Sequence, residues 1–443
     1  MDIVAVSKPI KTHSPMAVVM SSPNFRLLWA GQGMSLLGDQ FYLIAMPWLI
    51  LQRTGDPLAL GIILALAGLP RAVFMLLGGA VTDRFSPRKV MLVSDLARLG
   101  LIAGLTALAL TNTIQTWMLY AFSFLFGIAA GFFMPASTAM VPRLVGANNL
   151  RAGNAITQST SMIAQFLGPV MAGGLIAWAG RDMHFSTSLA IASPGLEGAA
   201  LAFGVDALTF LISVLTLWMI TLPAQPSPAT HERVLESIWS GLRQFWQDTF
   251  IRFVLIMMGC GGLIFTGALM VGVPVLANTH MSGGATTYGI LMSAYAAGCL
   301  MGVMVAGSLP KQNPFRIKVL LTAMNLMFAL GWFSFVTVHN TAIAAAVMLL
   351  IGVGSGYQMI TFFTALQQRV PKQMLGRLMS LVLLFNVGLS PLSQAIAGLV
   401  IKWSLAGLFG LTGVLFLIMV IWASFKPEYR MVGEILAAAQ PMD

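Results

Sequence analysis

An aspartate stands inside a segment that is otherwise built to avoid water. The stretch SLLGDQFYLI, residues 35–44, carries Asp39 as its single charged side chain. Arg71, in AGLPRAVFML (67–76), is a second isolated charge of this kind. Removal from water favours the neutral form of a carboxyl, whereas a nearby cation favours the charged form. These residue types indicate proton binding at Asp39 under the control of Arg71, with a static ion pair as the alternative.

The composition indicates that the surrounding solvent is lipid. Of the 443 residues, 58% are hydrophobic and 9% are charged, whereas about a quarter of the residues in a soluble chain are charged. Twelve segments are long and apolar enough to cross a hydrocarbon core of about 30 Å, and helices satisfy their backbones there. These segments are 25–51, 57–81, 90–111, 115–141, 151–179, 200–222, 251–277, 287–309, 317–338, 341–366, 376–402 and 405–425. We therefore expect an all-α integral membrane protein.

The basic residues predict the orientation of these spans. Most of the 24 Lys and Arg residues precede the first span or follow an even-numbered span, while the opposite loops keep only Arg53, Arg181 and Lys402. Cytoplasmic loops retain Lys and Arg, so we expect both termini in the cytoplasm. The net charge of +10 is then a topology signal, and no aromatic-interleaved basic patch favours nucleic acid as a partner.

The second half of the sequence repeats features of the first half. Residues around Pro47 match those around Pro274, and Gly61, Gly79 and Gly127 match Gly289, Gly307 and Gly352, all at offsets of 225–228 residues. Repeats of six spans run in the same direction, an arrangement that places a substrate site between the halves. We expect two pseudo-symmetric six-helix bundles, residues 1–222 and 251–443. A cytoplasmic linker, 223–250, joins them and contains an amphipathic helix from His231 onward.

The depths of the buried charges can be compared from the rise of a helix. Asp39 lies about 21 Å and Arg71 about 15 Å from the inner ends of their spans, which allows a contact between them. Asp95 and Arg98 are three residues apart and share a helical face. We expect them to support a gate together with Asp83 and Arg84, or else to form a static pair. Asp206, near the outer end of the sixth span, is expected to be an interfacial acid in water.

The loop between the second and third spans carries a motif. It reads GGAVTDRFSPRKVML (78–92), in which Gly79, Asp83, Arg84 and Arg88 fit G-x-x-x-D-R-x-x-x-R/K. At this point the chain resembles the major facilitator superfamily, although Ser86 and Pro87 depart from the commonest pattern. The resemblance implies that the glycine lets helices approach closely. It also implies that the acid faces the start of the eleventh span, near residues 376–377, and holds one gate closed.

A second stretch strengthens the resemblance. In QFLGPVMAGGLI (165–176), Gly168, Pro169, Gly173 and Gly174 resemble the family's antiporter motif, with simple helix packing as the alternative. The narrower similarity is to the drug/proton antiporter branch, whose members include macrolide and siderophore exporters. This branch implies alternating access of two bundles, driven by protons.

The sequence leads to an expected function and several rivals. We expect a monomeric, multi-pass exporter of amphipathic small molecules in the bacterial inner membrane, with protons as coupling ion, no cofactor, no metal and no enzymatic activity. The side chains predicted to line the substrate site are Tyr42, Tyr357, Gln358 and Asn386. The alternatives are an importer or lipid flippase on the same fold, and a transport-inactive membrane receptor.

Overall fold

The computed structural model describes residues 15–182, 194–221, 245–308, 313–370, 378, 381–382, 385 and 388–438, and every regular element in these ranges is a helix. The first half contains α1 (Pro15–Ser21), α2 (Pro23–Thr54), α3 (Pro57–Arg84), α4 (Pro87–Leu110), α5 (Thr116–Asp182) and α6 (Pro194–Met219). The second half contains α8 (Thr249–Gly267), the π-helix η1 (Ala268–Gly272), α9 (Val273–Thr279), α10 (Gly284–Ser308), α11 (Pro314–Ser334), α12 (Thr341–Arg369), α14 (Ser390–Ile401), α15 (Leu405–Ser424) and α16 (Pro427–Ala438).

The predicted spans agree with these helices. Within the described ranges, 11 helical segments are long and apolar enough to cross a membrane, and α14 is a shorter apolar helix at the place of the predicted eleventh span. The fourth and fifth spans are both parts of α5, which changes direction at Gly146, where φ is 69° and ψ is 167°. A positive φ is a conformation that glycine adopts without steric cost, so this residue allows two spans to join without a loop.

Local sequence signals fix where the helices begin. Pro57 opens α3, and the side chain of Asp56 accepts a hydrogen bond from the backbone N–H of Leu58 at 2.9 Å. Asp248 caps α8 in the same way, accepting from the N–H groups of Phe250 and Ile251. Such caps satisfy N–H groups that have no partner within their own helix.

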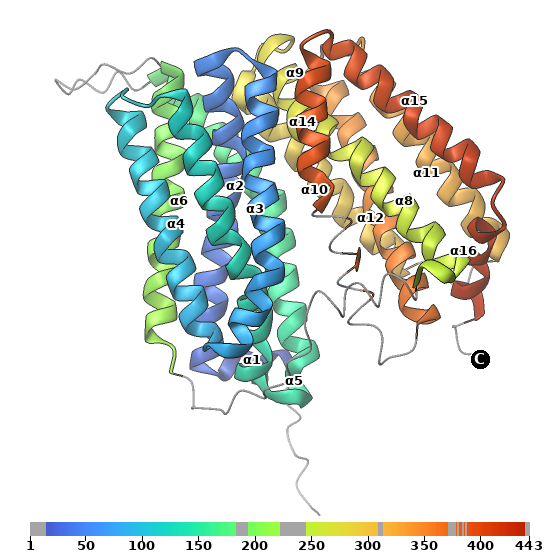
Figure 1. Cartoon of the computed structure of the whole chain (residues 1–443), viewed down its shortest axis with the longest axis horizontal. Coiled ribbons are helices and arrows are strands. Elements are labelled where there is room, and N and C mark those ends of the chain that lie inside the picture. Colours follow the sequence, from blue (N-terminus) through green and yellow to red (C-terminus); the bar gives the residue numbers. More distant parts are fainter. Residues whose placement is uncertain are drawn as a thin grey trace, which may run out of the picture.

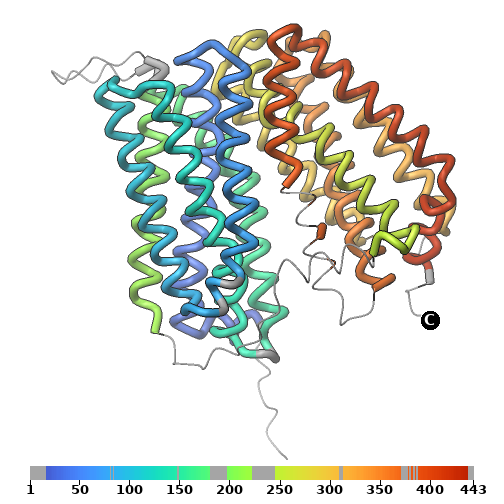
Figure 2. The backbone as a smooth tube through the Cα atoms, in the orientation of Figure 1, coloured from blue at the N-terminus to red at the C-terminus, as the bar shows by residue number. Residues whose placement is uncertain are grey.

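The two halves of the sequence are also two groups of helices in space. Helices α2 to α6 form one group and α8 to α16 the other; the groups lie side by side near α9 and α14 and diverge towards α1 and α16 (Figure 1). In the tube of Figure 2, the blue-to-green and the yellow-to-red residues separate in the same way. Helix α3 packs against α14, and α5 packs against α10.

Glycines make these two contacts close. A Cβ placed on Gly173 of α5 would lie 3.1 Å from the Cα of Gly289 on α10, and one placed on Gly61 of α3 would lie 3.1 Å from the Cα of Gly398 on α14. Small residues let membrane helices approach backbone to backbone. Gly61 and Gly289 are the equivalent positions predicted from the internal repeat, and here each lies at a contact between the halves.

A side chain of α14 interrupts the seventh span. The Ser393 hydroxyl accepts a hydrogen bond from the N–H of Gly267 at 2.7 Å and donates one to the carbonyl of Leu263 at 2.5 Å. In a regular α-helix these two backbone groups would bond to each other. The hydroxyl therefore replaces one helical bond, and the π-helix η1 begins directly afterwards. Insertion of a side chain into the hydrogen-bond ladder is a known cause of such irregularity.

The linker 223–250 is described only from Phe245 onward, so the predicted amphipathic helix lies outside the described residues. The sequence analysis did not predict α16, a helix that follows the last span. The hydroxyl of its Tyr429 accepts a hydrogen bond from the amide nitrogen of Asn325 at 3.4 Å, which holds α16 against α11.

Candidate functional site

Arg98 lies at the centre of a charged cluster in the first half. It projects from α4, is 2% exposed, and forms an ion pair with the fully buried Asp95 three residues earlier. The second oxygen of Asp95 accepts a hydrogen bond from the hydroxyl of Ser213, on α6, at 2.6 Å. Removal from water makes an isolated charge costly, and pairing with hydrogen bonds offsets that cost. Asp95 is therefore balanced by one guanidinium and one hydroxyl.

The same guanidinium also pairs with Asp39. Its Nη1 lies 3.6 Å from Oδ1 of Asp39 on α2, a side chain that is 35% exposed. The guanidinium carbon lies 4.2 Å and 4.5 Å from the ring centres of Phe133 and Phe210, so aromatic faces add cation–π attraction. Arg98 thus joins α2, α4, α5 and α6 at one point.

The ion pair of Asp39 is with Arg98 and not with the predicted Arg71. Arg71 is exposed on α3 and forms no ion pair among the described residues, although its charge acts on Asp39. The depth comparison behind the Asp39–Arg71 contact was one-dimensional, because the rise per residue says nothing about which face of a helix carries a side chain. Asp95 and Arg98 do share a face, as expected, and this face is turned towards Asp39.

The environment of Asp206 also differs from the predicted one. It was expected at the water interface, but in α6 it is 0% exposed. Its carboxylate lies against Gly38 of α2, since a Cβ placed on that glycine would be 2.5 Å from Oδ1. The first half therefore holds three carboxyl groups, Asp39, Asp95 and Asp206, in one cluster with Arg98.

The residues predicted to line the substrate site lie in different parts of the structure. Tyr42 belongs to the first half, where its ring stacks on Phe126 at 4.5 Å and its hydroxyl lies 3.5 Å from that of Ser123. Tyr357 is buried on α12, and Asn386 lies outside the described residues. Gln358 lines a cavity.

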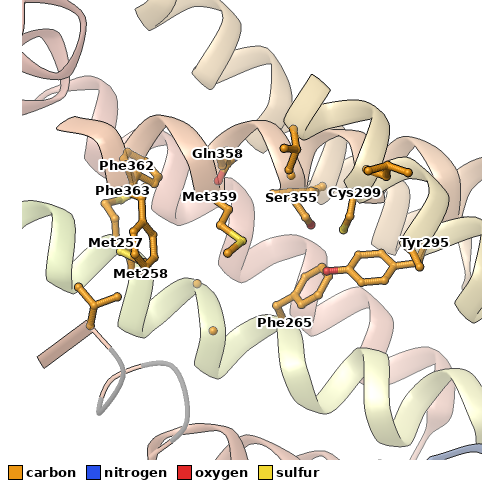
Figure 3. A pocket seen from close by; sticks show the side chains of 18 of the residues that line it. Met257, Met258, Phe265, Tyr295, Cys299, Ser355, Gln358, Met359, Phe362 and Phe363 are labelled. Carbon is orange, nitrogen blue, oxygen red and sulfur yellow. The ribbon is translucent and has the colours of Figure 1, made fainter. Parts of the chain in front are cut away.

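That cavity has a volume of about 740 Å³ and lies between the halves. The fifth span contributes Gln158, Met162 and Gln165, and the remaining walls come from the second half. Methionine and phenylalanine dominate, and none of the described lining residues is charged; the lining includes Met162, Met257, Met258, Met359, Met419, Phe265, Phe328, Phe362, Phe363 and Phe416. Figure 3 shows side chains of three helices around the same space: Met257, Met258 and Phe265 of α8, Tyr295 and Cys299 of α10, and Met359, Phe362 and Phe363 of α12.

Polar groups in the cavity are few. The amide nitrogen of Gln358 has no hydrogen-bond partner within the described ranges, and the Cys299 and Ser355 side chains lie nearby (Figure 3). The ring centres of Phe265 and Tyr295 are 5.7 Å apart. Of these residues Gln358 was predicted from the sequence. Cys299, Ser355 and Tyr295 were not, because which helix faces point inwards depends on the packing of the halves.

The loop motif is partly described. Asp83 lies in the last turn of α3, but its side chain is outside the described part. Its predicted partners, near residues 376–377, also lie outside the described residues, so the predicted lock stays a prediction. The close approach expected at Gly79 is wrong: a Cβ there would meet nothing within 4 Å. Gly78 makes it instead, with a hypothetical Cβ 2.9 Å from Cγ of Pro135.

Arg88 of the motif has a defined partner. Its Nε and Nη2 donate hydrogen bonds to the carbonyls of Leu217 and Trp218 at 2.7 and 2.5 Å. These are among the last carbonyls of α6, which have no partner within the helix and carry partial negative charge. Arg88 thus caps α6, while Arg84 is exposed.

The Gly168–Pro169–Gly173 stretch joins the two halves. Gly168 packs on Gln40 of α2, and Gly173 on Gly289 of α10. The N–H of Val170 donates a hydrogen bond to the hydroxyl of Ser293 on α10 at 3.0 Å. Packing was the alternative to an antiporter role for this stretch, and the structure shows that packing; a role in antiport stays a prediction.

Two bundles of membrane-spanning helices with a cavity between them are typical of secondary transporters. The sequence profile of the Major Facilitator Superfamily matches residues 28–393, and the chain belongs to this family of transporters, which are not enzymes. It is a multi-pass membrane protein.

Sequences similar to this chain include exporters. The chain is 27% identical over 389 residues to the Enterobactin exporter EntS of Citrobacter koseri and to that of Escherichia coli O139:H28, and the match covers 86% of this chain and 86% of each relative.

Solved structures show the same fold. A mutant of the nucleoside transporter NupG superposes with a TM-score of 0.72 at 12% identity, covering 91% of this chain and 100% of that one. A bacterial homologue of the human lysosomal transporter Spinster, in an inward-facing and unoccupied conformation, has a TM-score of 0.66 at 14% identity, covering 98% and 99%.

Proposed function

We propose that this protein exports amphipathic small molecules from the cytoplasm across the bacterial inner membrane, in exchange for protons and as a monomer. The observation that carries the proposal is the uncharged, methionine-rich cavity between the halves. Flexible, polarizable methionines adapt to ligands of different shape, and aromatic rings offer large apolar contact areas. Similarity to enterobactin exporters supports the outward direction.

The cavity favours a particular kind of molecule. With no charged side chain in the described lining, ring systems and apolar groups pack between Phe265, Tyr295 and the methionines. The amide N–H of Gln358 is buried without a partner in the described ranges, and a small rotation of this side chain would let it donate to a carbonyl or hydroxyl oxygen of the ligand. A charged group on the ligand has to stay at the open, watery end of the cavity, because its burial without a counter-ion is costly.

The charged cluster of the first half supplies the coupling. Protonation of Asp39 would neutralise its pair with Arg98 and leave the guanidinium with Asp95 alone. The contact between α2 and α4 would then weaken, which biases the first half towards another arrangement. A proton can shift a conformational equilibrium only if it binds to the two conformations with different affinity. The affinity of Asp39 for a proton would differ between a conformation with the Asp39–Arg98 ion pair and one without it. The basic residues favour cytoplasmic termini, so the open end of the cavity would face the cytoplasm.

Inside-out membrane vesicles test the proposal. We expect an imposed proton gradient, acidic inside, to drive accumulation of ethidium or enterobactin in vesicles that contain the protein. Asp39→Asn should abolish gradient-driven accumulation without lowering the amount of folded protein. Unchanged accumulation by this variant would remove Asp39 from the coupling mechanism. Accumulation only in right-side-out vesicles would indicate an importer.

Cys299 provides a test of binding alone. After Cys260→Ala removes the other cysteine, a maleimide reports access to Cys299 in the cavity. We expect ethidium or enterobactin to slow this labelling. Protection without any transport would identify a membrane receptor, whereas labelling at the same rate with and without either probe would place their binding outside the cavity.

A further inference from the structure

Asp206 is a buried carboxyl that the mechanism above does not use. It lies in the middle of the described part of α6, is 0% exposed, and neither of its carboxylate oxygens has a hydrogen-bond partner within the described ranges. The hydroxyl of Thr209, which lies beside it against Gly38, donates instead to the backbone carbonyl of Asp206 at 2.7 Å. A buried carboxylate whose one neighbouring hydroxyl donates to a backbone carbonyl is exceptional, because most buried polar atoms have partners.

The charged neighbours of Asp206 leave no cation for it. From α2 it faces Asp39 and Tyr42, and from α4 it faces Asp95 and Arg98. Arg98 is already paired with Asp95 and Asp39. No charged residue of α5 acts on Asp206 among the described residues.

The number of charges in the cluster decides its protonation. If all three acids were ionised, three negative charges would face two guanidinium groups, Arg98 in the cluster and Arg71, which acts on Asp39. Like charges that share a site cannot all ionise, and one proton is retained. Asp39 and Asp95 both have the guanidinium as a partner, so the group that retains the proton is Asp206. As a neutral acid it can donate its proton to a lone pair of the Thr209 hydroxyl.

We propose that Asp206 is the proton-binding carboxyl of the transport cycle, neutral in the arrangement seen here, and that Asp39 is the partly exposed group through which the proton enters and leaves. The proposal rests on the proposed function. In the transfer, the O–H bond on Asp39 breaks and an O–H bond forms on Asp206. The negative charge moves from Asp206 to Asp39, where Arg98 compensates it. The transfer thus restores the Asp39–Arg98 ion pair that the structure shows.

Infrared spectroscopy of the purified protein tests the protonation without any transported molecule. We expect the carboxylic-acid C=O band at neutral pH to lose intensity in Asp206→Asn relative to the wild type. Asp56→Asn is the matched control, because Asp56 is a partly exposed cap outside the cluster and asparagine can also cap α3; its spectrum should equal that of the wild type. Identical spectra for the wild type and Asp206→Asn would overturn the proposal.

Transport measurements test whether Asp206 releases its proton during each transport cycle or keeps it throughout. Asparagine resembles the neutral acid in shape, so Asp206→Asn should fold and carry ethidium down its concentration gradient. It should fail to accumulate ethidium when a proton gradient is imposed, and Asp206→Glu should restore part of that activity. Accumulation at the wild-type rate by Asp206→Asn would show that the acid is structural. If the wild type itself shows no response to the gradient, the proposed function fails, while the infrared result still decides whether Asp206 holds a proton.

Discussion

At the scale of single residues, the organisation of the first half depends on Arg98. One guanidinium holds Asp95 and Asp39 and lies between the rings of Phe133 and Phe210. It connects four helices with one fixed positive charge, which arginine keeps at any physiological pH. The acids around it are the groups that can change charge, and their number exceeds what one cation can neutralise.

Arg98→Ala should destabilise the protein strongly. Removing one partner of a buried ion pair leaves the other charge uncompensated and costs about 3–5 kcal/mol. The measurement is the unfolding free energy in mixed micelles, with Arg84→Ala as the control, because Arg84 is exposed and forms no ion pair among the described residues. Equal stabilities of the two variants would show that the buried cluster contributes nothing to folding.

Sequence reasoning found the charged residues but not their partners. Asp39, Arg71, Asp95 and Arg98 were all identified, and the pair three residues apart on one helix was correctly inferred from helical geometry. The ion pair between Asp39 and Arg98 was not predicted, since depth in the membrane leaves the direction of a side chain free. Asp206 was misplaced for the same reason: its distance from the end of a span suggested water, but it faces a glycine of the neighbouring helix.

At the scale of the helix, glycines determine where elements meet, and their contacts differ between adjacent positions. Gly78 lies against the fourth span, whereas Gly79 faces open space. The sequence motif includes Gly79 and not Gly78. Two consecutive residues point in directions about 100° apart around a helix. The motif alone therefore does not predict which of the two faces the neighbouring helix.

Gly78→Ala should therefore cost more than Gly79→Ala. The added methyl group at Gly78 would lie 2.9 Å from Cγ of Pro135 and 3.2 Å from the carbonyl oxygen of Gly131, and such overpacking costs about 1–3 kcal/mol. At Gly79 the methyl group meets nothing, so stability should stay near that of the wild type. Melting temperatures of the two purified variants provide the comparison, and a reversed order would contradict the helix contact described here.

Arg88 makes a second prediction about elements. Arg88→Ala removes two charge-assisted hydrogen bonds from the end of α6, a loss of about 2 kcal/mol. Arg84→Ala serves as the control, because Arg84 is exposed and forms no ion pair or hydrogen bond among the described residues. Hydrogen exchange of the amides at the end of α6 should increase in the first variant only. If both behave alike, the cap has no energetic role.

At the scale of the molecule, two equivalent bundles have different chemistry. The twelve spans, the repeat and the family resemblance followed from the sequence, because hydropathy and duplication are written along the chain. The chain has no Asp or Glu between Asp248 and Glu428, so carboxyl chemistry within the spans is confined to the first half. The cavity wall, by contrast, comes mostly from the second half. The two ligands of an antiporter would then bind to different bundles, and only relative movement of the bundles could couple them.

Such coupling requires the halves to separate where they now touch. Beside the glycine contacts, the amide of Gln52 on α2 donates a hydrogen bond to the side-chain oxygen of Asn278 on α9 at 3.0 Å. In a protein without its native cysteines, Gln52→Cys and Asn278→Cys joined by a short, reducible bis-thiol reagent should abolish gradient-driven ethidium transport, and reduction should restore it. The single-cysteine variants, treated with the same reagent, control for modification alone. Transport at the full rate through the cross-linked protein would show that this end never opens, and alternating access of the two bundles would have to be abandoned.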